Sequence, residues 1–126
     1  MSQKLDAKNL TPKAWLPINE IVQGVQGGKF TAVSLVGQAL ATIKMHQDFN
    51  AVIAIITDRS MERAKEIDKQ VSRGEKVGRL AGVPFIAKDN FLTFGTETTA
   101  ASNILKGFNA PYQSSAIELL EAEGAI

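Results

Sequence analysis

Apolar side chains recur every three or four residues in four parts of the chain, which is the spacing of helices that bury one face. The first stripe consists of Ile18, Ile21, Val22 and Val25, and a pair of glycines marks its end. The same periodicity, interrupted by polar residues and glycines, predicts helices at about 17–27, 31–46, 58–73 and 115–123.

Polar residues at the boundaries predict how three of these helices begin. Thr31 is expected to cap the second helix, and Thr57 or Asp58 the third, because their side chains accept hydrogen bonds from backbone N–H groups of the first turn. Ser115 and Glu118 fit a capping box at the start of the fourth helix.

Two short apolar runs lack helical spacing and are typical of buried strands. Residues 51–56 form a nearly continuous run rich in β-branched side chains, as in a strand that is covered on both faces. The second run begins with Pro84, which is tolerated at the first position of a strand. The sequence therefore predicts an α/β fold with a mixed sheet, in which the helices cover strands at about 51–57 and 84–88.

The composition predicts one modest globular domain. The chain has 126 residues, of which 44% are hydrophobic and 21% charged, as in ordinary soluble domains. Residues 1–16 mix lysines with polar residues and predict an irregular N-terminal arm. Residues 17–126 contain no repeat, low-complexity segment or internal boundary, so we expect them to form a single unit.

Charge and rare residues exclude several classes of function. The net charge of +1 gives no electrostatic argument for binding nucleic acid or a membrane. There is no cysteine and a single histidine, His46, so we expect no metal site and no cofactor site. No apolar run is long enough to span a bilayer, and the polar start lacks the apolar core of a signal peptide. The expected compartment is the cytoplasm.

Lys88 is the main candidate for chemistry because it closes the second predicted strand. A lysine is rarely buried without a partner, so its amine must reach water, bind an anion or lose its proton and become a base. In extended backbone Asp89 points to the opposite face and need not hold that proton. A plainer interpretation stays open, in which Lys88 reaches water from a strand end and Asp89-Asn90 is only a turn.

The order and spacing of several motifs resemble the amidase signature family, over roughly residues 30 to 126. Within this family the resemblance is strongest to the A subunits of the glutamyl-tRNA(Gln)/aspartyl-tRNA(Asn) amidotransferases. The motifs are the run Gly78 to Pro84, the run Ala87 to Asn90, Gly95, Thr98-Thr99, Ala101-Ser102, Pro111-Tyr112 and the final EAEGAI.

The resemblance implies that Lys88 is the terminal base of a Ser-cisSer-Lys triad. It also implies that the long loop at 90–113 lies beside this lysine at the base of the active site, rather than being a surface excursion. The residues that would support the site are Asp89, Asn90, Thr98, Thr99 and Ser102.

Two serines of such a triad, and a glycine- and serine-rich oxyanion hole, are missing from the sequence. The serines present lack a glycine-rich setting: Ser34, Ser60, Ser72, Ser102, Ser114 and Ser115. We therefore expect residues 17–126 to be the N-terminal fragment of an amidase domain that continues beyond Ile126, and the 126-residue chain to be inactive by itself.

For the whole protein, the resemblance implies hydrolysis of glutamine, or asparagine, to ammonia. A tRNA-binding partner, the B subunit of such complexes, would use ATP and Mg to amidate Glu-tRNA(Gln) or Asp-tRNA(Asn), and the small C subunit would complete the complex. A free-standing amidase that acts on another small amide is an alternative. A second alternative is a non-catalytic folding or interaction module, which open sheet edges would allow to self-associate.

Overall fold

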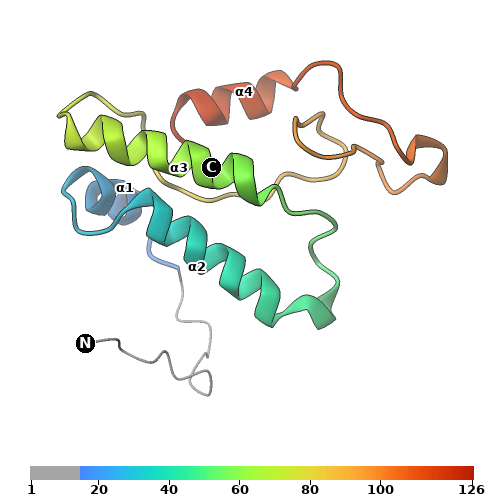
Figure 1. Cartoon of the computed structure of the whole chain (residues 1–126), viewed down its shortest axis with the longest axis horizontal. Coiled ribbons are helices and arrows are strands. Elements are labelled where there is room, and N and C mark those ends of the chain that lie inside the picture. Colours follow the sequence, from blue (N-terminus) through green and yellow to red (C-terminus); the bar gives the residue numbers. More distant parts are fainter. Residues whose placement is uncertain (1–14) are drawn as a thin grey trace.

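A computed structural model describes residues 15–126 of the chain. The predicted arm at 1–16 lies almost entirely outside these residues. Within the described part, four α-helices and two short 3-10 helices follow one another (Figure 1). Their bounds are α1 Ile18–Gln26, α2 Ala32–Met45, η1 Gln47–Phe49, α3 Thr57–Ser72, η2 Asn103–Leu105 and α4 Ser115–Ala122.

The four helices lie within one residue of the predicted bounds at both ends. Thr31 caps α2 as predicted, because its Oγ1 accepts a hydrogen bond of 3.0 Å from the backbone N of Ser34. The other two predicted caps are wrong. Helix α3 already includes Thr57, and α4 begins after Ser114, whose backbone is extended, so that Ser115 is the first helical residue rather than the cap.

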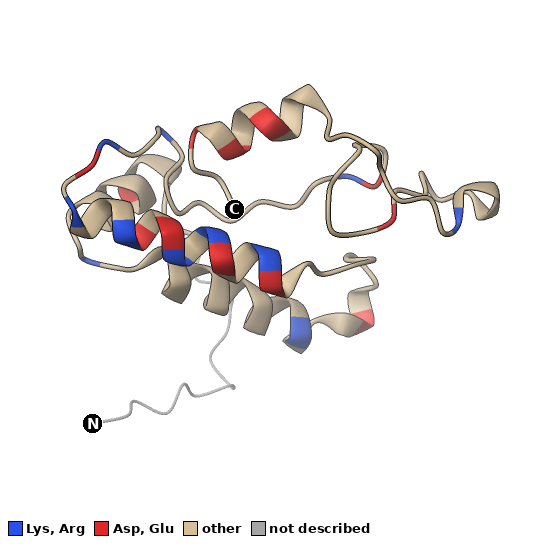
Figure 2. Ribbon diagram, turned by 45° about the horizontal axis from the view of Figure 1, so that its top comes forward, with Lys and Arg blue, Asp and Glu red and all other residues tan. Residues whose placement is uncertain are grey.

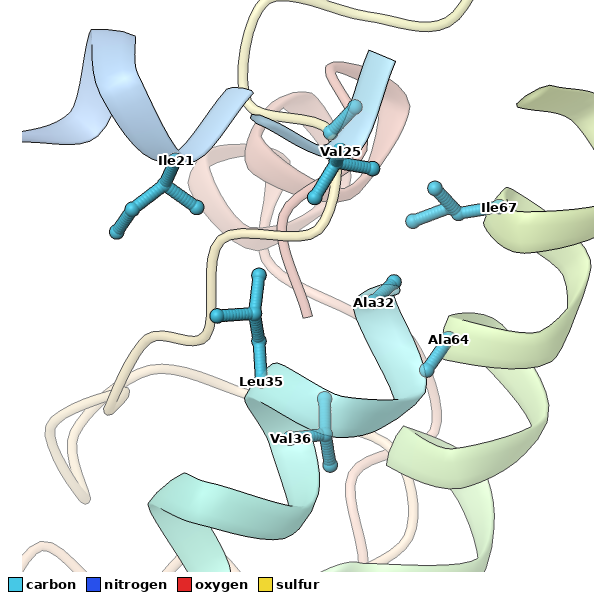
Figure 3. Close-up of a cluster of buried hydrophobic side chains, with 8 residues drawn as sticks. Ile21, Val25, Ala32, Leu35, Val36, Ala64 and Ile67 are labelled. Carbon is cyan, nitrogen blue, oxygen red and sulfur yellow. The ribbon is translucent and has the colours of Figure 1, made fainter. Parts of the chain in front are cut away.

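The core lies where α1, α2 and α3 meet (Figure 3). Ile21 and Val25 of α1 and Leu35 of α2 supply most of its apolar volume. Ala32 and Ala64 are completely buried at the contact of α2 with α3, and their small side chains let these two helices approach closely. The opposite face of α3 carries acidic and basic residues along its whole length (Figure 2).

A carboxylate on α3 binds the start of α2. Asp68 accepts hydrogen bonds from the backbone N of Ala32, at 2.7 Å, and from that of Val33, at 3.1 Å. These N–H groups lack partners inside α2, and the negative charge also favours the positive end of the helix dipole. Asp68 therefore fixes the angle and position at which α2 begins relative to α3.

Residues 80–85 run beside the end of the chain, at 123–126, and exchange backbone hydrogen bonds with it. Glycine makes this approach possible on both sides. A methyl group added at Gly78 would lie 2.3 Å from the carbonyl oxygen of Glu123. Gly124 has φ +89°, a left-handed conformation that only glycine adopts without strain, and it packs against Ala81. The segment that leads to Lys88 is thereby anchored.

The predicted mixed sheet is wrong. Residues 15–126 contain no strand, and only one isolated antiparallel bridge joins Glu97 to Asn109. The apolar run at 51–56 is extended but unpaired, and Ile53 in it is 75% exposed. A buried strand needs hydrogen-bonded neighbours and covered faces, which a one-residue-at-a-time pattern cannot guarantee. The open sheet edges expected to mediate self-association are therefore absent from the described residues as well.

We predict that Asp68→Ala lowers the free energy of unfolding by about 1–2 kcal/mol, because it leaves two N–H groups at the start of α2 without an acceptor. Urea denaturation of the 126-residue chain measures this change. Glu66→Ala is the matched control on the same helix, since Glu66 is exposed and makes only a long surface contact with Lys69. Equal losses in both variants would refute the role of Asp68.

Candidate functional site

An open hollow of about 1250 Å³ lies between the helices and the extended segments. Its walls come from the second half of α2, the start of α3 and one turn of α4, together with the runs at 51–56 and 84–91 and part of the loop that follows. Lys88 lines this hollow. Its side chain is exposed, so the burial that we expected for the amine is not provided by the described residues.

The backbone around Lys88 is held from both sides. Upstream, Phe85 donates from its N to the carbonyl of Ile126 at 2.7 Å, and Ile126 donates to Val83 at 2.9 Å. Downstream, the N of Phe91 donates to the carbonyl of Lys88 at 3.0 Å and closes a turn. Asp89 and Asn90 occupy the middle of this turn, as the sequence predicts. Lys88 thus stands between an anchored extended segment and a tight turn.

Asp89 binds the loop that lies ten residues further along the chain. Its Oδ1 accepts a hydrogen bond of 2.9 Å from the backbone N of Thr99, and its Oδ2 accepts one from Thr99 Oγ1. Its own carbonyl accepts a third bond, of 2.8 Å, from the N of Ala100. The bonds from Thr99 hold the pKa of the Asp89 carboxyl below its ordinary value. The side chain therefore stays ionised at neutral pH.

The loop held by Asp89 contains strained backbone. Ala100 and Ala101 have φ +48° and +58°, a left-handed conformation that costs a residue with a Cβ about 1–2 kcal/mol. Thr99 stabilises both ends of this stretch, because its Oγ1 accepts from the N of Ala101 at 3.3 Å and its carbonyl accepts from the N of Ser102 at 2.8 Å. Such conformations persist only where neighbouring contacts fix them.

The remaining predicted support residues have different positions. Asn90 is exposed on the rim of the hollow. Thr98 is buried, and its Oγ1 donates to the carbonyl of Phe91 at 3.4 Å. Ser102 does not line the hollow, because its Oγ accepts from the N of Ile104 and caps η2. The structure thus brings Lys88, Asp89, Thr98 and Thr99 together and leaves Ser102 apart.

A second polar cluster, which the sequence did not indicate, borders the same hollow. Arg59 of α3 binds Glu121 of α4 through two hydrogen bonds, of 2.6 and 2.8 Å. Gln113 donates to the same carboxylate at 2.7 Å, and Arg63 donates to the carbonyls of Glu121 and Ala125. The partners lie up to 62 positions apart in the chain, so no local pattern could have found this cluster.

The pKa of Glu121 reflects two opposing effects. Burial raises it, but the hydrogen bonds from Arg59 and Gln113 and the charges of Arg59 and Arg63 outweigh burial and hold it below its ordinary value. Glu121 is therefore an ionised acceptor in a structural clamp between α3 and α4. Its ionised state and full set of donors argue against a role in proton transfer.

The hollow offers a base candidate without a paired nucleophile. Lys88 forms no ion pair or side-chain hydrogen bond with residues 15–126. Ser60 also lines the hollow, but no bond joins it to Lys88 in the described part. No group of three or more His, Cys, Asp or Glu side chains is placed there to hold a metal ion. No helix that the structure describes is long and apolar enough to cross a membrane.

Comparison with protein families and curated proteins gives a consistent result. A family model described as Amidase matches residues 34–126. The A subunit of the mitochondrial glutamyl-tRNA(Gln) amidotransferase from Ornithorhynchus anatinus is 37% identical over 111 residues, which cover 88% of this chain and 21% of that protein. The A subunit numbered 2 of the glutamyl-tRNA(Gln) amidotransferase from Clostridium acetobutylicum is 46% identical over 79 residues, 63% of this chain and 16% of the relative. The chain thus spans about a fifth of these relatives.

Solved structures of amidases share the arrangement of the chain. A bacterial aryl acylamidase of the amidase signature enzymes superimposes with a TM-score of 0.82 at 26% identity, covering 92% of this chain and 25% of that one. The peptide amidase of Stenotrophomonas maltophilia gives 0.81 at 27% identity, covering 91% and 24%. A chain from an inhibitor-bound complex related to the origins of an s-triazine catabolic enzyme gives 0.84 at 31%, covering 88% and 25%.

We predict that Glu121→Gln lowers the free energy of unfolding by about 2 kcal/mol at pH 7, because Gln replaces a charged acceptor of several hydrogen bonds. A carboxyl with a lowered folded pKa stabilises the fold above its unfolded pKa, about 4.3, and loses this contribution as the pH falls through the folded value. The gap between the two proteins should therefore close in acid, as urea denaturation at a series of pH values would measure.

The control for this prediction is Glu118→Gln, which changes an exposed carboxylate in the first turn of the same helix. Its effect should stay within about 0.5 kcal/mol at every pH. A Glu121→Gln gap that is equally large at pH 3 and pH 7 would show that the charge of Glu121 is irrelevant to the clamp.

Proposed function

The chain belongs to the amidase signature family, and from this we propose that it is the N-terminal part of the amidase subunit of a tRNA-dependent amidotransferase. The observation that carries this proposal is the position of Lys88. The lysine stands on the rim of an open hollow, beside a loop that Asp89 holds in a strained conformation, and it has no ion-pair partner among residues 15–126. An amine in this setting is free to serve a nucleophile from outside the described residues.

The proposed role of Lys88 is that of the terminal base in a Ser-cisSer-Lys triad. One serine would attack the carbonyl carbon of the amide, the second serine would take its proton, and the Lys88 amine would receive the proton from the second serine. The amine must arrive neutral, because an ammonium group has no lone pair. The protein segments that supply both serines would also cover the exposed lysine and exclude water from it.

The proposed substrate is glutamine, whose hydrolysis would give glutamate and ammonia. The ammonia would pass to a tRNA-binding partner, the B subunit, which would use ATP and Mg to amidate Glu-tRNA(Gln) or Asp-tRNA(Asn) beside the small C subunit. Support comes from the curated relatives, which are named for the amidotransferase and reach 46% identity. The compartment stays a prediction: we expect the cytoplasm, whereas the Ornithorhynchus relative is named mitochondrial.

A free-standing amidase is the second candidate. It is supported by the superposition on a peptide amidase and an aryl acylamidase, at 26–27% identity. The higher identity to the amidotransferase subunits ranks this candidate below the first. Purification of the full-length protein that carries this segment separates the two, since only an amidotransferase subunit should co-purify with a tRNA-binding partner.

We predict that the 126-residue chain alone releases no ammonia from glutamine, because no serine in the described part is paired with Lys88. A coupled glutamate dehydrogenase assay at high protein concentration measures this release. Activity that survives repeated purification and is lost with Lys88→Met would overturn the prediction.

A chimera tests the role of Lys88 directly. Residues 34–126 replace the matching segment of the Clostridium protein, and glutaminase activity is measured with and without Lys88→Met. We expect Lys88→Met to reduce kcat/KM by about 10²–10⁴-fold, the usual contribution of a general base. Lys65→Met, at an exposed position of α3 that does not line the hollow, is the matched control. Full activity of the Lys88→Met chimera would end the proposal.

A further inference from the structure

The carboxylate of Asp89 is the charge nearest to Lys88 along the chain, and it is already engaged. Both of its oxygens accept hydrogen bonds from Thr99, one from the backbone N at 2.9 Å and one from the hydroxyl. Lys88 and Asp89 make no ion pair in the part of the chain that the structure describes. Thr99 therefore holds the only adjacent carboxylate away from the candidate base.

The same contacts fix the loop that borders the hollow. Asp89 receives three hydrogen bonds from two consecutive residues, Thr99 and Ala100. The Thr99 hydroxyl then accepts from Ala101, so one side chain connects the carboxylate to both alanines with positive φ. Without these contacts nothing in the described structure compensates for the strain in this backbone, and the loop would relax to another conformation.

The other charged groups around the hollow are already paired within residues 15–126. Arg59 and Arg63 from α3 bind Glu121 from α4. Glu97, on the loop, accepts a hydrogen bond of 2.9 Å from the backbone N of Gly107. Lys88 and Asp89 complete the set of charged residues that line the hollow. A freed Asp89 carboxylate would thus find the Lys88 ammonium as its nearest unpaired cation along this wall.

We propose that Asp89 and Thr99 are positioning residues of the Lys88 base: Thr99 keeps the Asp89 carboxylate away from the amine, and together they hold the loop at 98–101 against the hollow. This inference rests on the proposed function of Lys88. It assigns Thr99 an effect on catalysis through a charge that it does not carry.

The test is Thr99→Val in the chimera described above, since valine keeps the shape of threonine and removes its hydroxyl. The Asp89 carboxylate loses one donor and turns to Lys88, which then holds its proton more tightly. We expect kcat to fall about 10- to 100-fold with KM within about twofold, as for a displaced catalytic group. The limb of the kcat/KM profile that reports loss of the proton should move to higher pH by about one unit.

Two variants separate this effect from mere loss of structure. Thr99→Ser restores the hydroxyl and should restore both the rate and the pH profile. In the double variant Asp89→Asn with Thr99→Val there is no carboxylate to turn toward Lys88, so the alkaline shift should disappear even though the rate stays low. Thr42→Val on α2, outside the hollow, is the matched control and should behave as the unmodified chimera.

Each outcome decides between the alternatives. A rate loss in Thr99→Val without a pH shift, or a shift that persists with Asp89→Asn, would overturn the positioning role and leave the proposed function intact. An active Lys88→Met chimera would instead remove the proposed function itself. If Thr99→Val fails to fold, Asp89→Glu provides the test, because the longer side chain cannot keep both bonds to Thr99. The same alkaline shift is then expected, and its absence would overturn the inference.

Discussion

The ion pair between Arg59 and Glu121 determines where the hollow and Lys88 lie. Helix α4 contributes a single buried residue, Ile117, so its place beside α3 depends on this pair and on Arg63 and Gln113 rather than on a wide apolar contact. Figure 1 shows α3 between α2 and α4. The end of α4 leads into residues 123–126, which bind the segment before Lys88. A polar clamp near the C-terminal end thereby fixes a candidate base that lies far earlier in the chain.

The helices were predictable from sequence because their buried faces repeat at a local spacing, and the cap at Thr31 depends on a residue only three positions away. The sheet was not, because the apolar run at 51–56 indicates which residues could be buried but not whether other backbone lies beside them. Asp68 and Glu121 escaped notice for the same reason, since their partners are 36 and 62 positions away.

The site was predicted in part. The resemblance to amidases indicated Lys88, Asp89 and Thr99 together, and the structure joins the last two by direct hydrogen bonds. It did not indicate that Asp89 faces the loop rather than the lysine, or that alanines adopt positive φ beside it. Burial of Lys88 was inferred from the apolar run before it, but Ile86 in that run is itself 71% exposed. A run of apolar letters reports a preference, and neighbouring segments decide whether it is met.

The uncovered extended segments have a practical consequence. Ile53 and Ile86 display apolar surface next to the hollow, and residues 51–55 leave their backbone groups without partners in the described structure. Surfaces of this kind attract molecular chaperones and hydrophobic dyes, and they promote precipitation as protein concentration rises. A preparation of these 126 residues would therefore call for dilute, low-temperature handling, and fluorescence of a bound dye would report how completely a complementary polypeptide shields them.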